Sequence, residues 1–287
     1  MPEIPELEAI RAFLAERLPG RRVAAVDPRI PPVFRTPAAE LRERLPGDVF
    51  GAPLRHGKFL LLPFASGMVL AVNPMLTGRF QYVPADEPLA KRTCLRITVE
   101  DGRDLRYVDD RVMGKLYFLP ADGLARIPGW ADAGPDFLDP ALTEELWVER
   151  IRRFRGAIKA VLTNAKFVQG IGNAYADEIL WEARVNPFTP RTALDEAQLR
   201  ALFRAGRAVM AWAVPLAAAA MVRGDRLDYE ERRDFLRVHR RGGQPCLRCG
   251  TPISEITAGG HVTSFCRTCQ PGGPLIGRGA TGRPAGR

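Results

Sequence analysis

The chain has 287 residues, of which 46% are hydrophobic and 26% are charged, and its formal net charge is +9. These values are typical of a globular protein, and the length allows two domains with cores of their own. No apolar run approaches the ~18 residues that a membrane span needs, and no basic region followed by an apolar core opens the chain. We therefore expect no membrane association, no signal peptide and a cytoplasmic location. The excess of positive charge, mostly from arginine, favours a polyanionic partner.

The residues that follow Met1 combine an amine with two carboxylates. Removal of Met1 would expose Pro2 as a free secondary amine, a nucleophile that forms an iminium without further activation. Apolar residues three or four apart predict that a helix starts here: Ile4, Leu7, Ile10, Phe13, Leu14 and Leu18. The helix dipole disfavours protonation of the amine, and Glu3 and Glu6 are placed for acid/base chemistry. The alternative is an ordinary helix start, since Pro and Glu both favour first turns.

Residues up to about 120 predict an antiparallel β domain that carries one or two helices. Apolar or alternating segments predict strands at about 22–26, 59–62, 68–72, 95–100, 105–108 and 116–119, and a second helix at about 37–45. Asp101-Gly102 between two alternating segments is a strong hairpin signal. Lys58 lies at the entrance of an apolar strand, where Gly57 allows close backbone approach, so it could reach a phosphate or a base. The alternative for Lys58 is a solvated edge residue.

Residues 121–142 are rich in Pro, Gly and Ala and are typical of a linker. Beyond them the apolar period changes from two to 3.6, which predicts a helical domain over 143–237. We expect its helices at about 143–153, 156–164, 174–183, 195–220 and 228–237. Gly170 and Gly172 predict a tight turn, Asn173 is placed to cap the next helix, and the backbone N–H groups there predict a phosphate site. The alternative is a helix-turn-helix with purely structural glycines.

Four of the five cysteines form two C-x₂-C pairs near the C-terminus, within a segment that we delimit as 238–271. They are Cys246, Cys249, Cys266 and Cys269. This spacing predicts one tetrahedral Zn²⁺ ion with four thiolate ligands, which is structural because no position is left open for catalysis. Residues between the pairs predict a two-stranded ribbon. The tail, 272–287, lacks an apolar period and is expected to be disordered.

Taken together, these motifs resemble the formamidopyrimidine-DNA glycosylase / endonuclease VIII family. The resemblance rests on Met-Pro-Glu-x-Pro-Glu, His56-Gly57-Lys58, the 166–180 block and the four cysteines, in the family's order from Pro2 to Gln270. It implies a multidomain α+β fold. An N-terminal antiparallel β-sandwich with flanking helices (2–120), a helix-two-turns-helix domain (143–237) and a β-ribbon zinc finger (238–271) would clamp DNA as a monomer.

The resemblance also implies base-excision repair of double-stranded DNA that contains damaged bases or abasic sites. The damaged nucleotide would rotate out of the duplex, Pro2 would attack C1′, and Glu3, with Glu6 nearby, would handle protons. Two further roles are implied for groups around the lesion: Lys58, Asn173 and Gly172 would hold phosphates, and Lys166 would lie near the flipped nucleotide. Elimination would then cut the strand on both sides. The implied activity is that of a DNA glycosylase with AP lyase activity, with no cofactor beyond zinc.

The chain departs from the family's pattern at four places. His261 stands where the zinc finger has an arginine, which puts efficient second elimination in doubt because histidine lacks the permanent charge. Asn73 replaces a histidine. The residues that fill the space of the flipped base are Leu76, Arg111 and Met113, so the wedge is aliphatic. The segment 223–246 is short for a loop that closes over 8-oxoguanine, which leaves hydantoins, abasic sites and oxidised pyrimidines open as substrates.

Two other functions remain open from the sequence. One is a non-catalytic relative that binds damaged DNA with the same clamp, against which Pro2, Glu3 and Lys58 argue. The other is an RNA-binding protein, because related helix-two-turns-helix units occur in the ribosome. That reading leaves the N-terminal residues unexplained.

Overall fold

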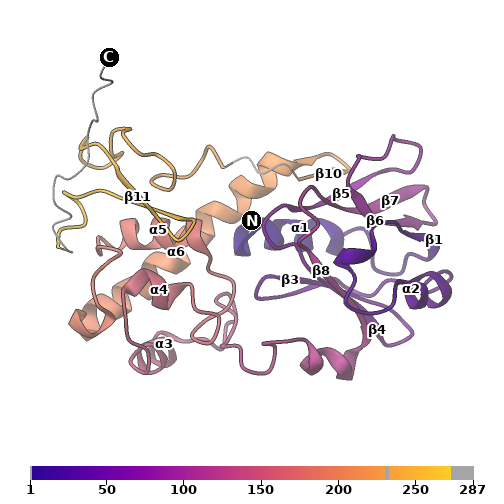
Figure 1. Cartoon of the computed structure of the whole chain (residues 1–287), viewed down its shortest axis with the longest axis horizontal. Helices are drawn as coiled ribbons and strands as arrows, with labels where there is room; N and C mark the ends of the chain where they lie inside the picture. Colours follow the sequence, from indigo (N-terminus) through magenta and orange to yellow (C-terminus); the bar gives the residue numbers. More distant parts are fainter. Residues whose placement is uncertain (1, 230–232, 273–287) are drawn as a thin grey trace, which may run out of the picture.

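The computed structural model describes residues 2–229 and 233–272. They form two lobes, and the N-terminus lies between them (Figure 1). Apart from Gly272, the predicted tail falls outside the described residues. In the described part of the chain, no helix combines the length and the apolar surface that crossing a membrane requires.

The first lobe is a sandwich of two antiparallel sheets. The four-stranded sheet runs in the order β2 (Leu54–His56), β3 (Phe59–Pro63), β4 (Met68–Asn73) and β8 (Lys115–Pro120). The six-stranded sheet runs in the order β1 (Val23–Pro28), β6 (Thr93–Val99), β7 (Arg103–Asp109), β5 (Gly78–Pro84), β10 (Arg226–Asp228) and β9 (Val222–Arg223). Inward-facing residues of both sheets share one core, so the predicted β-sandwich is confirmed. The hairpin at Asp101-Gly102 forms as predicted, between β6 and β7.

Helices and short 3₁₀ segments flank the sandwich. They are α1 (Ile4–Ala15), α2 (Ala38–Arg44), η1 (Pro31–Val33) and η2 (Ala121–Arg126). The last of these lies in the predicted linker, and with Trp130 it covers the outer face of β4. Because both faces of β4 are buried, its sequence is a continuous apolar run rather than an alternating one.

The second lobe is helical and carries the β-ribbon. Its helices are α3 (Glu144–Ile151), α4 (Ile158–Leu162), α5 (Asn173–Glu182) and α6 (Glu196–Met221), with η3 (Arg191–Ala193) before the last. Thr143 caps α3 by accepting from the Leu146 N–H, and Asp195 forms a capping box with Gln198 at the start of α6. The ribbon pairs β11 (Ser254–Ala258) with β12 (His261–Phe265) and packs on α5.

The two lobes exchange elements. Ile4 in the first turn of α1 packs in the core of the helical lobe, whereas the end of α6 and β10 contribute Met221 and Leu227 to the core of the sandwich. The helix predicted over 228–237 is therefore wrong in the described residues. Leu227 and Asp228 pair with β5 instead, because Leu227 completes the sandwich core, and no helix forms over 233–237.

Candidate active site

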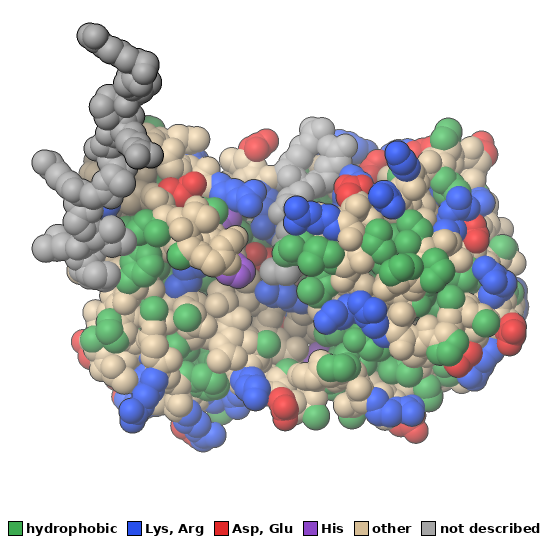
Figure 2. Space-filling view, in the orientation of Figure 1, with side chains coloured by type: hydrophobic (Ala, Val, Ile, Leu, Met, Phe, Trp, Pro, Cys, Tyr) green, Lys and Arg blue, Asp and Glu red, His purple; other side chains and the backbone are tan. Residues whose placement is uncertain are grey.

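A cleft of 1310 Å³ opens between the two lobes. Lys and Arg side chains stand around the hollow at the centre of the molecule (Figure 2). The cations that line the cleft outnumber the carboxylates; they are Lys58, Lys159, Arg233, Arg240 and Arg241, against Glu3 and Asp234. His239 and His261 also line it. This balance of charge suits a polyanionic ligand.

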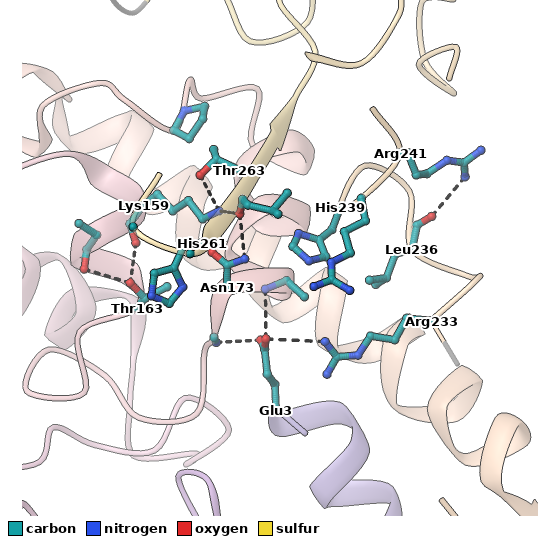
Figure 3. A pocket seen from close by; sticks show the side chains of 18 of the residues that line it. Glu3, Lys159, Thr163, Asn173, Arg233, Leu236, His239, Arg241, His261 and Thr263 are labelled. Carbon is teal, nitrogen blue, oxygen red and sulfur yellow. Dashed lines mark hydrogen bonds and ion pairs between the residues drawn. The ribbon is translucent and has the colours of Figure 1, made fainter. Parts of the chain in front are cut away.

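Glu3 lines the cleft, and its carboxylate lies at the N-terminal end of α5 (Figure 3). The carboxylate accepts N–H groups of Gly172 at 2.8 Å, Ala174 at 3.1 Å and Tyr175 at 3.3 Å. The prediction of a phosphate site at this helix start therefore needs correction, since Glu3 occupies these donors. Asn173 does not cap the helix either, because Gly172 is the N-cap residue.

The two glycines of the turn are required by close contact with the first lobe. A Cβ on Gly172 would lie 2.3 Å from Cδ of Glu3, so any side chain there would displace the carboxylate. Gly170 has φ +95°, and a Cβ there would lie 2.3 Å from Cγ1 of Ile4. The prediction of a tight Gly-x-Gly turn is thus explained by the docking of α1 against α5.

Glu6 forms a second buried carboxylate behind Glu3. One of its oxygens accepts the Glu3 N–H at 2.9 Å, and the other accepts the Tyr175 hydroxyl at 2.8 Å. Arg233 donates from Nε to Glu6 at 2.9 Å, and its guanidinium lies 3.9 Å from Glu3. Arg233 thus offsets part of the charge of two carboxylates that would otherwise be costly to bury together.

Pro2 and Lys58 flank Glu3. Pro2 is buried and precedes Glu3, the N-cap residue of α1. Pro2 does not itself line the cleft, but Glu3 does. Lys58 lies in the turn between β2 and β3 and lines the cleft. Burial lowers the pKa of the Lys58 ammonium below its ordinary value, the charge of Glu3 opposes this shift and that of Arg233 adds to it.

Lys159, which the sequence analysis did not single out, occupies the cleft in place of Lys166. Its Nζ lies 2.7 Å from Oδ1 of the buried Asp177 and donates to the Val262 carbonyl at 2.8 Å. Burial lowers the pKa of Lys159, and Asp177 opposes the shift. Lys166 is exposed and does not line the cleft. The signal for Lys159 was a lysine within the apolar helix Ile158–Leu162.

Asn173 and His261 meet at the ribbon. The Asn173 amide donates to the Val262 carbonyl at 2.8 Å, which fixes the ribbon against the start of α5. His261 is exposed at the beginning of β12 and lines the cleft. Both predicted residues are therefore brought to the same wall of the cleft as Lys159.

Leu76, Arg111 and Met113 are exposed on two neighbouring loops of the sandwich, and Leu76 also lines the cleft. A fully buried carboxylate, Asp109, ties these loops together. It accepts the Thr77 hydroxyl at 2.5 Å and backbone N–H groups of Arg111 at 3.2 Å and Met113 at 2.9 Å. The sequence analysis missed Asp109 because nothing in its spacing separates it from a loop aspartate.

The four cysteines meet as predicted. Their sulfur atoms all lie within 4.8 Å of one another, with Sγ–Sγ distances of 3.9 Å for Cys246–Cys269 and 3.5 Å for Cys249–Cys266. Tetrahedral zinc with Zn–S bonds of 2.3 Å requires about 3.8 Å between sulfurs. The donor set therefore fits one structural zinc ion. Trp181 of α5 donates from Nε1 to the Cys246 sulfur at 3.4 Å, which anchors the finger to the helical lobe.

Models of known families match most of the chain in three parts. The formamidopyrimidine-DNA glycosylase N-terminal domain matches residues 1–116, and the H2TH domain of the same enzymes matches residues 133–223. The zinc finger found in FPG and IleRS matches residues 243–272. The three matches follow the order of the sandwich, the helical lobe and the ribbon.

Individual proteins match over the same extent. Formamidopyrimidine-DNA glycosylases of Pelotomaculum thermopropionicum and Desulforamulus reducens are 33% and 34% identical over 276 residues, which cover 94% of this chain and 99% of each relative. Two solved structures of Lactococcus lactis FPG cover 94% of this chain at 26% identity. A mutant bound to Fapy-dG DNA has a TM-score of 0.85, and the protein bound to abasic-site DNA has one of 0.83. This chain therefore belongs to the formamidopyrimidine-DNA glycosylase family.

Proposed function

We propose that this chain excises oxidised or ring-opened bases from double-stranded DNA and cuts the strand at the resulting abasic site, with Pro2 as the nucleophile. Its family makes it a base-excision DNA glycosylase, and AP lyase activity is part of that family's function. One observation carries the proposal. Glu3 is held by the first turn of α5 inside a basic cleft and directly follows a buried Pro2.

The chemistry requires a covalent bond between Pro2 and the sugar. The Pro2 nitrogen attacks C1′ of the flipped nucleotide, the bond from C1′ to the base breaks, and the base leaves with a proton. Opening of the sugar ring leaves an iminium, from which loss of a C2′ proton expels the 3′ phosphate. Glu3 is the group within reach to carry these protons, and Glu6 holds the Glu3 backbone at 2.9 Å.

The cations of the cleft support binding of the phosphates on both sides of the lesion. Lys58 contributes from the sandwich, and Asn173 and His261 line the opposite wall. The Gly172 N–H is not available to a phosphate, because it donates to Glu3. We place Lys159, rather than Lys166, beside the flipped nucleotide, because Lys159 lines the cleft. Lys and Arg contacts of this kind make binding dependent on salt.

The exposed side chains of the two sandwich loops suit the space that the flipped base leaves in the duplex. Leu76 and Met113 are apolar and can insert between base steps. Arg111 has donors that can read the orphaned partner base. Asp109 anchors both loops through hydrogen bonds to Thr77, Arg111 and Met113, which supports a shared role of these loops at the space left by the flipped base.

We infer that the enzyme works on chromosomal DNA in the cytoplasm, associated with the nucleoid through its substrate. Its charge of +9 supports a standing attraction to DNA.

Borohydride trapping on a duplex with one abasic site tests the nucleophile. The wild-type protein should give a covalent protein–DNA complex, because borohydride reduces the iminium to a stable amine. Pro2→Gly should give little or none, since it removes the secondary amine.

Equal amounts of covalent complex with both proteins would exclude Pro2 as the nucleophile. If neither protein forms a covalent complex but both bind the abasic duplex tightly, the chain is a relative that binds damaged DNA without catalytic activity.

A further inference from the structure

Arg233 enters the cleft from the segment between β10 and the zinc finger, and its guanidinium points toward Glu3 (Figure 3). Its side chain is only 13% exposed, and its Nε donates to Oε1 of Glu6 at 2.9 Å. Nη1 lies 3.9 Å from Oε1 of Glu3. The guanidinium carbon also lies 5.5 Å from the ring centroid of Tyr175, whose hydroxyl donates to the same Glu6 oxygen. Arg233 therefore faces both carboxylates at the start of the chain.

Glu6 connects Arg233 with the backbone of the N-terminus. Its other oxygen, Oε2, accepts the Glu3 N–H at 2.9 Å. This N–H belongs to the peptide bond that joins Pro2 to Glu3, so the contact holds the residue that carries the proposed nucleophile. A displacement of the Glu6 carboxylate would therefore move Pro2 as well.

Arg233 differs from another arginine of the cleft in its surroundings. Arg240 is exposed and lines the cleft, where a phosphate can reach its guanidinium. Arg233 is buried beside two carboxylates, whose negative charge repels a phosphate at that place. The same carboxylates would be costly to bury without the cation. These surroundings favour a role of Arg233 toward the carboxylates over a contact with DNA.

Resting on the function proposed above, we propose that Arg233 is a positioning residue for the reaction. Through Glu6 it fixes the Pro2–Glu3 peptide, and so it holds the Pro2 amine where C1′ of the flipped nucleotide arrives. A nucleophile attacks from about 3–3.5 Å, and a displacement of about 1 Å costs up to about 100-fold in rate. Tyr175 supports the same Glu6 oxygen from α5.

The test measures covalent trapping on an abasic duplex, under single-turnover conditions, and binding of a tetrahydrofuran duplex. Arg233→Met removes the cation and keeps an unbranched chain. It should slow formation of the covalent complex about 10- to 100-fold. Affinity for the tetrahydrofuran duplex should change by less than about threefold. Arg233→Lys restores the charge without the planar fork and should recover part of the rate.

Arg237→Met is the matched control. The Arg237 guanidinium lies 4.4 Å from the ring centroid of Trp212, and the residue does not line the cleft. This variant should form the covalent complex at the wild-type rate. Thermal denaturation shows whether each variant is folded at the temperature of the assay.

A double-mutant cycle tests whether Arg233 acts through Glu6. Glu6→Gln should itself slow trapping, because it weakens the contacts with Arg233 and with the Glu3 N–H. Adding Arg233→Met to Glu6→Gln should then cost little more, since the two residues act as one unit.

Three results would overturn the proposal. The first is trapping by Arg233→Met at the wild-type rate. The second is a double variant in which the two losses multiply, as they do for independent sites. The third is a weaker affinity with an unchanged rate in the bound complex and a salt slope reduced by about 1, which would make Arg233 a phosphate contact.

Failure of the underlying function is seen separately, as a wild-type protein that forms no covalent complex with abasic DNA. The position of the peptide is then followed by NMR of the Glu3 amide, on protein with isotope-labelled glutamate. Arg233→Met should speed hydrogen exchange of this amide about 10-fold, because Glu6 no longer holds it. Unchanged exchange in Arg233→Met would reject the positioning role.

Discussion

Glu3 joins the two lobes at the scale of a single residue. Its backbone leads into α1, and its carboxylate accepts three N–H groups at the start of α5. Those donors and the helix dipole hold the carboxylate that we propose as the acid/base group in one position before any substrate binds. Such preorganisation spares the enzyme the cost of ordering the group during the reaction.

Lys58 gives a prediction for pH at the same scale. Burial lowers its pKa, so as the pH rises Lys58 loses its positive charge earlier than an exposed lysine does. Affinity for an abasic-analogue duplex should therefore fall as the pH rises, at a lower pH than the ordinary lysine pKa of about 10.4 would give. Lys58→Arg stays charged and should hold its affinity further into the alkaline range. Fluorescence anisotropy across this range measures both profiles.

Lys91 provides the matched control because it is exposed in the sandwich and does not line the cleft. Lys91→Arg should reproduce the wild-type profile. Identical profiles for wild type and Lys58→Arg would show that Lys58 does not carry the charge that holds the phosphate.

At the scale of elements, the two loops that carry Leu76, Arg111 and Met113 depend on Asp109. Replacing Asp109 by Asn puts an amide donor among N–H and O–H donors, which leaves buried donors without acceptors. We expect Asp109→Asn to lower the free energy of unfolding by about 1–3 kcal/mol. It should also reduce the preference for an abasic-analogue duplex over an intact one. Urea denaturation and competition binding measure the two effects.

Asp110→Asn is the control for this substitution, since Asp110 is adjacent, exposed and paired with Arg79 at 2.9 Å. Its effect on stability should stay within about 0.5 kcal/mol. The anchoring role of Asp109 would be rejected if both variants behaved alike.

The sequence predicted those elements whose signal is local. Apolar periodicity placed α1, α5 and α6, Asp101-Gly102 placed a hairpin, and the C-x₂-C pairs placed the metal ligands. The 228–237 prediction failed because Leu227 pairs with β5, a contact across more than 140 residues that no local pattern records. A β-strand of three residues is fixed by its partner strand rather than by its own propensity.

The residues of the candidate site also fall into two groups, those with a local sequence signal and those whose role comes from tertiary contacts. The motif residues Glu3, Lys58 and Gly172 were predicted, because each stands beside a turn or helix start. Lys159 and Asp177 were missed, since their roles come from an ion pair formed when α4 packs on α5. The phosphate-site prediction at α5 failed for a related reason. The N–H donors were placed correctly, but their acceptor comes from the other lobe.

At the scale of the whole molecule, exchanged elements fix the cleft. Ile4 lies in the helical core and Met221 in the sandwich core, and α1 packs along α6. The walls of the cleft are therefore set by two shared cores rather than by a flexible linker. The zinc finger is held differently, since polar contacts and one indole connect it to α5.

Removal of zinc should therefore affect the start of α5 and DNA binding as well as the finger itself. Chelation under reducing conditions should unfold residues 246–269, because a structural zinc site supplies much of the folding free energy of such a module. Lys159 and Asn173 then lose the Val262 carbonyl, and Asp177 loses the Ser264 N–H. Hydrogen exchange should rise in the finger and at the start of α5, while amides of the β6–β7 hairpin stay protected. DNA affinity should fall with the exchange, and readdition of zinc should restore both. Unchanged affinity in the metal-free protein, or exchange confined to the finger, would contradict this coupling.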